Sequence, residues 1–375
     1  MTSGDRKRTL PFARAALAGA ASLALLAGTA GAADEEKVLH VYNWVDYIGE
    51  TTIADFEEET GIKVVYDTYD ASETVDAKLL AGSSGYDVLI HAGSFMPKLI
   101  EAGIFHGVER GKMPNYANLD TEILGILENW DPGNEYGVPY MWGTVGITYN
   151  VDMVKERIPD APLGSLDMLF KEEYISKLAD CGVSVLESPV DVIPMALAYL
   201  GLDPNTEDKK DFEKVVEAFK PIREHITVFD SANYLNALPN KELCMAITWS
   251  GDYAVAASRA EEAGVDVNLE YHIPETGVGV WFDVWAIPAD APHPENAHIW
   301  LDYMMRPEVI AAATNYTWYA NANKAANEFV EPDIIGDPAV YPDAEVMSRM
   351  WTTKTLSQRG QRARTRAWSR IKTGQ

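Results

Sequence analysis

The stretch VLHVYNWVDYIGETTIADFEEETGIKVVYD (38–67) contains the alternation that decides the fold of this chain. Its first part, Val38–Tyr42, is an apolar run typical of a buried strand, and Lys63–Tyr66 is a second such run. Between these runs, Thr51–Glu59 has the apolar spacing of a helix that ends at Gly61. A strand, a helix and a strand in this order predict parallel pairing of the two strands.

The same alternation continues beyond this stretch. Residues 73–80 indicate a second helix, Asp87–His91 a third strand, and Phe95–Ala102 a third helix. Strands that alternate with helices in this way predict an α/β fold.

A longer extended run marks the next part of the chain. Val138–Asn150 is too long for an ordinary strand and contains Gly143 and Gly146, so we interpret it as a crossing between two lobes. Asn268–Pro274 is a second candidate crossing, because Gly277–Ile287 resumes an apolar strand pattern. Two crossings predict hinged lobes with a ligand cleft between strand ends, in a chain too long for one hydrophobic core. The predicted elements between the crossings are the strands Cys181–Leu186 and Met245–Trp249 and the helices Val192–Leu200 and Phe212–Phe219.

Residues 1–33 have the organisation of a secretory signal peptide. A basic segment precedes the apolar run Ala15–Ala27, and Ala30-Gly31-Ala32 fits the small-residue cleavage pattern. The apolar run is shorter than the roughly 18–20 residues that a membrane span needs, and no later segment is long and apolar enough. We therefore expect an exported protein without membrane insertion, which is periplasmic in a cell with two membranes. The basic residues of the leader are Arg6, Lys7, Arg8 and Arg14.

The chain is strongly acidic, with a formal net charge of −26. Without the basic leader the charge becomes about −29, which argues against nucleic acid and anionic membranes as partners. Such a charge attracts a cationic ligand, although the acidity could equally serve solubility alone. The C-terminal segment Arg359–Lys372 is basic and contains no acid. We expect it to dock as a helix on the acidic body, with a partner-binding role as the alternative.

The chain has two cysteines, Cys181 and Cys244. In an oxidising compartment two cysteines most often form a disulfide, and a loop of this length would stabilise the fold by about 3–4 kcal/mol. Their spacing matches no metal motif.

Three short stretches place an aromatic ring beside a carboxylate. They contain Trp44 and Asp46, Trp249 and Asp252, and Trp281 and Asp283. Carboxylates accept charge-assisted hydrogen bonds from ammonium groups, and indole faces attract cations and pack alkyl chains. Together the stretches would suit a small organic cation, although in a chain with 10 Trp and 18 Tyr such neighbours also arise by chance and most buried Trp belong to the core.

The sequence lacks the motifs of the common catalytic and cofactor sites. HExxH, GxSxG, the P-loop and GxGxxG are all absent, and no two histidines lie four residues apart, so no cofactor and no metal are predicted. A pair of carboxylates could serve an exported hydrolase, which remains a remote alternative.

In their order along the chain, several segments resemble the periplasmic polyamine-binding proteins, the receptors of ABC importers for putrescine and spermidine. The resemblance covers 38–375, and the putrescine-type branch is the most similar. It implies a type II periplasmic-binding-protein fold, a non-enzymatic protein, a membrane permease as partner, and a monomer. The segments that carry the resemblance are 38–48, 56–67, Lys78–Gly82, Pro139–Thr144, Tyr319–Asn323 and the Arg-Ala-Arg-Thr-Arg-Ala-Trp tail (362–368).

The resemblance also implies roles for individual residues. It predicts a disulfide between Cys181 and Cys244, as in the putrescine-type proteins. It divides the chain into a first lobe, 34–143 plus 274–322, and a second lobe, 144–273 plus 323–375. The residues that match ligand-binding positions of the family are Trp44, Asp46, Tyr47, Ser94, Phe95, Asp191, Trp249, Asp252, Trp281, Asp283 and Tyr319.

Four positions depart from the family pattern. Val45 and Ala92 replace hydroxyl residues, and Asp191 is one methylene shorter than the usual Glu. Trp281 is more typical of spermidine-type members, whereas putrescine-type members usually have Phe. These departures leave the choice between putrescine and spermidine open. The same fold binding another small amine or an amino-acid derivative remains an alternative.

Overall fold

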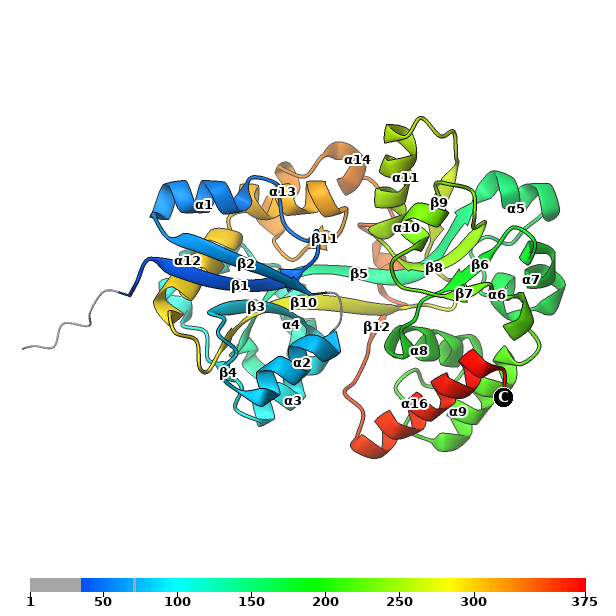
Figure 1. Ribbon diagram of the computed structural model, residues 1–375, viewed down its shortest axis with the longest axis horizontal. Coiled ribbons are helices and arrows are strands. Elements are labelled where there is room, and N and C mark those ends of the chain that lie inside the picture. Colours follow the sequence, from blue (N-terminus) through cyan, green and yellow to red (C-terminus); the bar gives the residue numbers. More distant parts are fainter. Residues whose placement is uncertain (1–34, 70–71) are drawn as a thin grey trace, which may run out of the picture. The chain divides into compact units, whose positions relative to one another are not determined.

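Residues 35–69 and 72–375 are described by the computed structural model, so the predicted leader at 1–33 lies outside the described residues. From Glu36 to Gln375 the chain forms one unit. Its main strands have the order β2-β1-β3-β10-β5-β8-β6-β7, with helices on both faces of the sheet (Figure 1). The strands are β1 (Val38–Trp44), β2 (Lys63–Tyr69), β3 (Val88–Ala92), β4 (Phe105–His106), β5 (Gly137–Asn150), β6 (Val183–Val185), β7 (Val228–Phe229), β8 (Met245–Trp249), β9 (Leu269–His272), β10 (Gly279–Pro288), β11 (Ala320–Asn321) and β12 (Trp351–Thr352).

Some helices begin or end at residues that satisfy terminal backbone groups. Gly61 ends the first helix in the left-handed conformation, with φ of 68°, and the Asp208 side chain accepts a hydrogen bond from the backbone of Lys210 at the start of α9. Among the described residues, no helix is long and apolar enough to cross a membrane. The helices are α1 (Thr52–Thr60), α2 (Ser72–Ala81), α3 (Met96–Glu101), α4 (Thr121–Leu127), α5 (Val151–Arg157), α6 (Asp167–Phe170), α7 (Glu172–Leu178), α8 (Pro189–Tyr199), α9 (Lys209–Phe219), α10 (Tyr234–Ala237), α11 (Asp252–Glu262), α12 (Pro294–Met304), α13 (Pro307–Thr317), α14 (Pro332–Ile335), α15 (Ala344–Met347) and α16 (Gln358–Thr373).

The predicted parallel pairing at the start of the chain is confirmed. β1 pairs in parallel with β2, so that Trp44 lies opposite Tyr69, and it also pairs in parallel with β3. The sheet is nevertheless mixed, because β10 lies between β3 and β5 and is antiparallel to both. The predicted α/β class is therefore confirmed. The direction of β10 was not predicted, because the alternation of strands and helices does not give it.

The long extended run 138–150 is one continuous, fully buried strand, β5. Its length is explained by its partners, because the part up to Thr144 pairs with β10 and the part from Val145 pairs with β8. Figure 1 shows this strand running through the unit beside β10. β9 pairs with the second part of β5, and the chain then continues into β10, which pairs with the first part.

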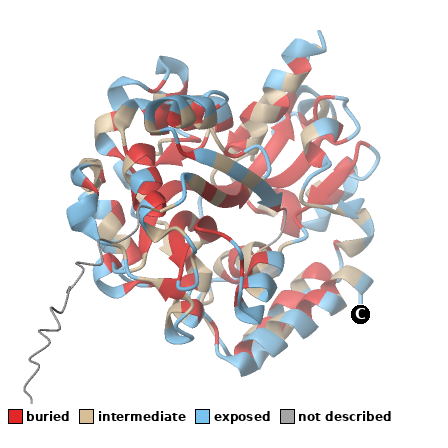
Figure 2. Ribbon diagram, turned by 60° about the vertical axis from the view of Figure 1, so that its left-hand side comes forward, coloured by how far each residue is buried: buried red, intermediate tan, exposed pale blue. Residues whose placement is uncertain are grey.

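Buried apolar side chains form two clusters. The first contains residues from 39 to 142 and from 280 to 340, and the second contains residues from 145 to 278 and from 356 to 371. Figure 2 shows that buried residues follow the strands and the inward sides of the helices. The clusters divide within β5. Ala326 and Val340 belong to the first cluster, because apolar side chains after Asn323 pack on α13 and the first core. The division into lobes, with 323–375 in the second, stays a prediction.

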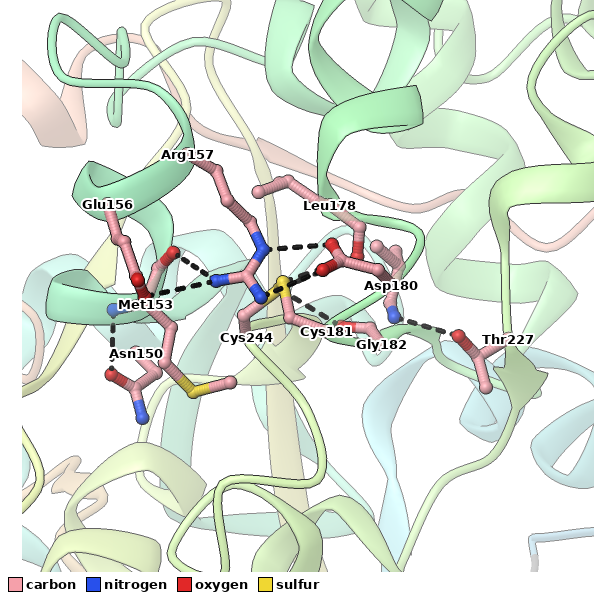
Figure 3. The surroundings of a disulfide bond; sticks show 11 residues. Asn150, Met153, Glu156, Arg157, Leu178, Asp180, Cys181, Gly182, Thr227 and Cys244 are labelled. Atoms are coloured by element: carbon pink, nitrogen blue, oxygen red, sulfur yellow. Dashed lines mark hydrogen bonds and ion pairs between the residues drawn. A yellow bond between two sulfur atoms is a disulfide. The ribbon is translucent and has the colours of Figure 1, made fainter.

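The predicted disulfide is present in the structure. Cys181 and Cys244 are bonded, with their Cα atoms 5.6 Å apart, and both side chains are buried. The bond joins the segments that lead into β6 and β8, which are parallel neighbours. Beside it, the Arg157 guanidinium forms an ion pair with Asp180 at the surface (Figure 3).

The basic C-terminal segment forms α16 and docks on the body, as predicted. Trp368 is buried, packs edge-on against Phe229, and donates a hydrogen bond from Nε1 to Glu187. Arg370 and Lys372 form ion pairs with Glu213 and Glu187. α16 lies along α9, so this part of the basic tail is matched to acidic side chains of the same chain.

Candidate functional site

The candidate site lies where the two apolar clusters meet. Trp249 ends β8 and Trp281 lies near the start of β10, and each indole packs against both clusters. Trp281 also contacts the Tyr319 ring edge-on, with centroids 5.0 Å apart. Aromatic residues predicted from sequence to hold a ligand therefore form the junction between the cores.

Asp283 lies at this junction opposite a β-bulge in β5. It pairs with Ala92 of β3, and between the pairs Phe282–Trp142 and Val284–Pro139 the strand β5 has one residue more than β10. Bulges are common beside binding sites. Trp44 ends β1 at the same edge of the sheet, and its ring lies 4.4 Å from that of Tyr69.

The Asp283 carboxyl is in an environment that disfavours its charge. The residue is 7% exposed, and burial raises its pKa to about 7, against smaller lowering effects of Tyr47 and Trp44. Within the described residues, no Lys or Arg forms an ion pair with Asp283, and neither Tyr47 Oη nor Trp44 Nε1 has a well-formed hydrogen bond. A buried carboxyl group without a basic partner is suited to receive a cation from outside the chain.

Asp252 connects the two clusters. It is the first residue of α11, and its carboxylate accepts hydrogen bonds from Tyr234 and, at 2.5 Å, from Tyr319. Tyr319 belongs to the first cluster and Tyr234 to the second. Burial raises the pKa of Asp252, although the two phenols and Arg259 oppose the rise.

Asp191 is a third carboxylate at a helix start. It lies in the first turn of α8, and Ser188 Oγ donates a hydrogen bond of 2.6 Å to it. Burial raises its pKa, while Ser188, Arg364 and the Trp249 indole lower it. The shared Trp249 links Asp191 with the junction.

Two glycines allow the aromatic rings to approach the backbone. A Cβ at Gly143 would lie 2.6 Å from the Trp281 ring, and one at Gly251 would lie 2.8 Å from the Tyr319 ring. Any larger residue at these positions would displace a ring from the site, which explains why β5 has glycine in a fully buried strand.

Three of the predicted ligand-binding residues, Asp46, Ser94 and Phe95, have contacts other than those at the junction. Asp46 is exposed, has a φ of 53°, and lies close enough to Tyr66 to contribute to its raised pKa. The backbone carbonyl of Ser94 accepts a hydrogen bond from Thr355, and Phe95 stacks on His91. For these residues a ligand role stays a prediction.

The structure adds residues that the sequence did not single out. Tyr234 donates to Asp252, and Tyr140 donates a hydrogen bond to the backbone carbonyl of Tyr47. Tyr69 lies beside Trp44, and Asp283 contributes to the raised pKa of Tyr69. Tyr69 could have been found, because it ends the strand that is parallel to β1 and so reaches the same sheet edge. Tyr234 begins the short helix α10 and has no comparable signal.

Two α/β cores with carboxylates and aromatic rings at their junction define a solute-binding protein. A family model described as bacterial extracellular solute-binding protein matches residues 51–342, and the chain belongs to this family. The chain is 48% identical over 350 residues to the putrescine-binding periplasmic protein SpuD of Pseudomonas aeruginosa, covering 93% of this chain and 95% of the relative. It is 42% identical to the putrescine-binding periplasmic protein PotF of Escherichia coli, covering 96% of this chain and 98% of that one.

A solved structure agrees with these relatives. The spermidine/putrescine ABC transporter substrate-binding protein PotD of Streptococcus pneumoniae superposes with a TM-score of 0.78 at 26% identity. The match covers 90% of this chain and 99% of that chain. The predicted periplasmic-binding-protein fold is therefore confirmed, and the chain is a periplasmic binding component of the transporter class rather than an enzyme.

Proposed function

We propose that this protein captures a small polyamine between two lobes and delivers it to the permease of an ABC importer, with putrescine as the favoured ligand. The two apolar clusters are the cores of these lobes, with crossings in β5, between β9 and β10, and after Val340. SpuD and PotF are 48% and 42% identical to this chain, and both are described as putrescine-binding proteins. This similarity favours putrescine over other solutes.

The observation that carries the proposal is the buried carboxyl of Asp283 beside aromatic rings. A protonated amine would supply the cationic partner that the Asp283 carboxylate lacks. A neutral ligand would form no such charge pair and would bind more weakly. A second ammonium group at Asp252 or Asp191 would make the site selective for chain length, because a ligand of the wrong length would leave a carboxylate unpaired.

The aromatic rings would hold the carbon chain of the ligand. Each buried methylene contributes about 0.8 kcal/mol, and indole faces also attract the ammonium groups at its ends. We assign this role to Trp44, Trp249 and Trp281, with Tyr47 and Tyr319 as the walls beside the carboxylates. Asp46, Ser94 and Phe95 would line the entrance.

Closure of the two lobes would follow from ligand contacts with both. Asp283 and Trp44 belong to the first core, and Asp191 belongs to an element of the second, so a ligand that touches both sides favours the closed state. The permease would then distinguish the loaded form from the unloaded form by its shape.

A thermal-shift screen tests the proposal. The periplasmic protein is unfolded, freed of small molecules, refolded, and heated with putrescine, cadaverine, spermidine, agmatine or a set of amino acids. At a ligand concentration of 1,000 times Kd, the stabilisation is about 4 kcal/mol, which raises Tm by several degrees. We expect the largest rise with putrescine. A rise with an amino acid and none with any amine would contradict the proposed ligand class.

A further inference from the structure

A second group of potential ligands lies at the other end of the first core. Asp87 immediately precedes β3, His40 lies in β1, and His293 immediately precedes α12. In the sequence, His40 and His293 lie 47 and 206 residues from Asp87, so spacing alone did not predict a metal site.

The three side chains converge on one carboxylate. The Asp87 side chain is fully buried, and its oxygens accept hydrogen bonds from the backbone N–H groups of His40, at 2.7 Å, and His293, at 2.6 Å. His293 Nδ1 lies 3.1 Å from Asp87 Oδ2, and His40 Nδ1 lies 3.7 Å from the same oxygen. The backbone contacts therefore hold the carboxylate in place while both rings face it.

The geometry is close to that of a metal centre with nitrogen and oxygen ligands. The three ligand atoms all lie within 4.8 Å of one another. Around a tetrahedral zinc ion with bonds of about 2.0–2.1 Å, neighbouring ligand atoms are about 3.3 Å apart. The Asp87–His293 separation of 3.1 Å already fits, and the His40 Nδ1–Asp87 Oδ2 separation of 3.7 Å is only slightly longer than this spacing.

The hydrogen bonding of the rings supports this interpretation. His40 Nδ1 is buried and has no hydrogen-bond partner within the described residues, so the fold leaves a nitrogen lone pair or N–H unsatisfied beside a buried negative charge. A metal ion between the groups would satisfy it and would offset the charge of Asp87.

We propose that His40, Asp87 and His293 bind a divalent late first-row metal ion such as Zn²⁺, with water completing the coordination. Two imidazoles and one carboxylate suit Zn²⁺, whereas Ca²⁺ and Mg²⁺ prefer oxygen ligands alone. The ion would join β1, the start of β3 and the start of α12. Because Trp44 lies four residues after His40 along β1, about 13 Å away, the ion would not touch the amine site.

Metal binding can be measured directly on the purified periplasmic protein. After treatment with a chelator and its removal, equilibrium dialysis against ZnCl₂ with elemental analysis gives the stoichiometry and Kd. We expect one high-affinity Zn²⁺ per chain in the wild type. His40→Gln and His293→Gln should each weaken binding by at least about tenfold, the lower end of what the loss of even an outer-shell partner costs.

His272→Gln is the matched control. His272 Nε2 also lies beside a carboxylate, 3.2 Å from Glu270, but among residues 35–69 and 72–375 no third ligand joins that pair. This variant should bind Zn²⁺ like the wild type, and circular dichroism without metal should show that all three variants are folded. The proposal is overturned if the wild type binds no Zn²⁺, or if His40→Gln and His293→Gln retain wild-type affinity.

Co²⁺ gives a readout that does not depend on any variant. Its visible absorption is intense in a tetrahedral site and weak in an octahedral one, so a tetrahedral band that Zn²⁺ displaces supports the proposed centre. If no tetrahedral absorption band appeared at saturating Co²⁺, the proposed geometry would be contradicted.

Discussion

Among single residues, the proposed ligand binding depends on carboxyl groups that the fold keeps away from water. Burial raises the pKa values of Asp191, Asp252 and Asp283. For Asp283 the pKa reaches about 7. Asp252 differs from Asp283 because two phenols already donate hydrogen bonds to it. Asp283 is therefore the carboxyl group with most to gain from an ammonium ligand.

Replacing Asp283 by Asn should abolish tight amine binding while leaving the fold intact. The change removes one partner of a buried charge pair and leaves the ammonium group without its countercharge, at a cost of about 2 kcal/mol or more, or at least thirtyfold in Kd. Titration calorimetry measures the loss. Glu101→Gln, on the exposed last residue of α3, removes the same charge far from the site and should change Kd little. Equal losses in both variants would show that overall charge, not Asp283, attracts the ligand.

The raised pKa of Asp283 predicts how affinity depends on pH. The ligand pairs with the ionised form, so Kd should rise as pH falls below about 7, approaching tenfold per pH unit. The unliganded protein should show the opposite trend, since a carboxyl pKa raised by folding stabilises the fold at low pH. That contribution is lost as pH rises from the ordinary carboxyl range to about 7.

Calorimetric titrations between pH 5.5 and 8.5 test this dependence. Asp283→Asn, which cannot titrate at this position, is the control and should remove most of the slope. A wild-type Kd that is constant across this range would mean that the carboxyl group is already ionised in the unliganded protein.

The sequence singled out several residues of the candidate site, but not the contacts between them. Trp249, Asp252, Trp281 and Asp283 were identified by an aromatic ring next to an acid, and the structure brings them to one junction. No local pattern marks Tyr234, because its link to Asp252 depends on the packing of α10 against α11. The same limit applies to the β-bulge in β5 opposite Asp283, which is defined only by the pairing of β5 with β10.

At the scale of elements, the disulfide joins two parallel strands of the second core. Replacing both Cys181 and Cys244 by Ser should lower the free energy of unfolding by about 3–4 kcal/mol, because the unfolded chain then regains the freedom of a long loop. Urea unfolding of both proteins measures the change. A reducing agent should destabilise the wild type by a similar amount and leave the double variant unaffected. An unchanged unfolding midpoint in the double variant would contradict this role.

The elements were predicted well where they are local. The early strands and helices follow from apolar spacing and stop signals, and the structure extends β1 and β2 by only two or three residues beyond the predicted runs. β5 was recognised as unusual by its length, but its two sets of partners required tertiary pairing. Short strands such as β4, β7 and β12 have no periodic pattern and exist only through their neighbours.

At the scale of the whole molecule, the two cores share strands, and the carboxylates and aromatic rings lie between them. Binding should favour the closed arrangement, so putrescine should reduce the radius of gyration measured by small-angle X-ray scattering. Asp283→Asn with the same amine should show no contraction at concentrations that saturate the wild type. A radius that does not change in the wild type would show that the lobes do not close on the ligand.

The boundary between the cores illustrates what long-range packing decides. The sequence predicts crossings at 138–150 and at Asn268–Pro274, whereas the apolar clusters divide within β5 and between Val278 and Val280. The segment after Asn323 returns to the first core because Ala326, Val330 and Ile334 pack there, which no local signal distinguished from packing on the second core.

The most direct test of the central claim is a calorimetric titration of the refolded protein, freed of small molecules, with putrescine at pH 8. At this pH Asp283 is ionised in most molecules, so protonation does not compete with the ligand. We predict saturable binding of one putrescine per chain, and much weaker binding of an amine of equal length with a single ammonium group. Saturable binding of neither putrescine nor any other diamine or triamine by the folded protein would contradict the account.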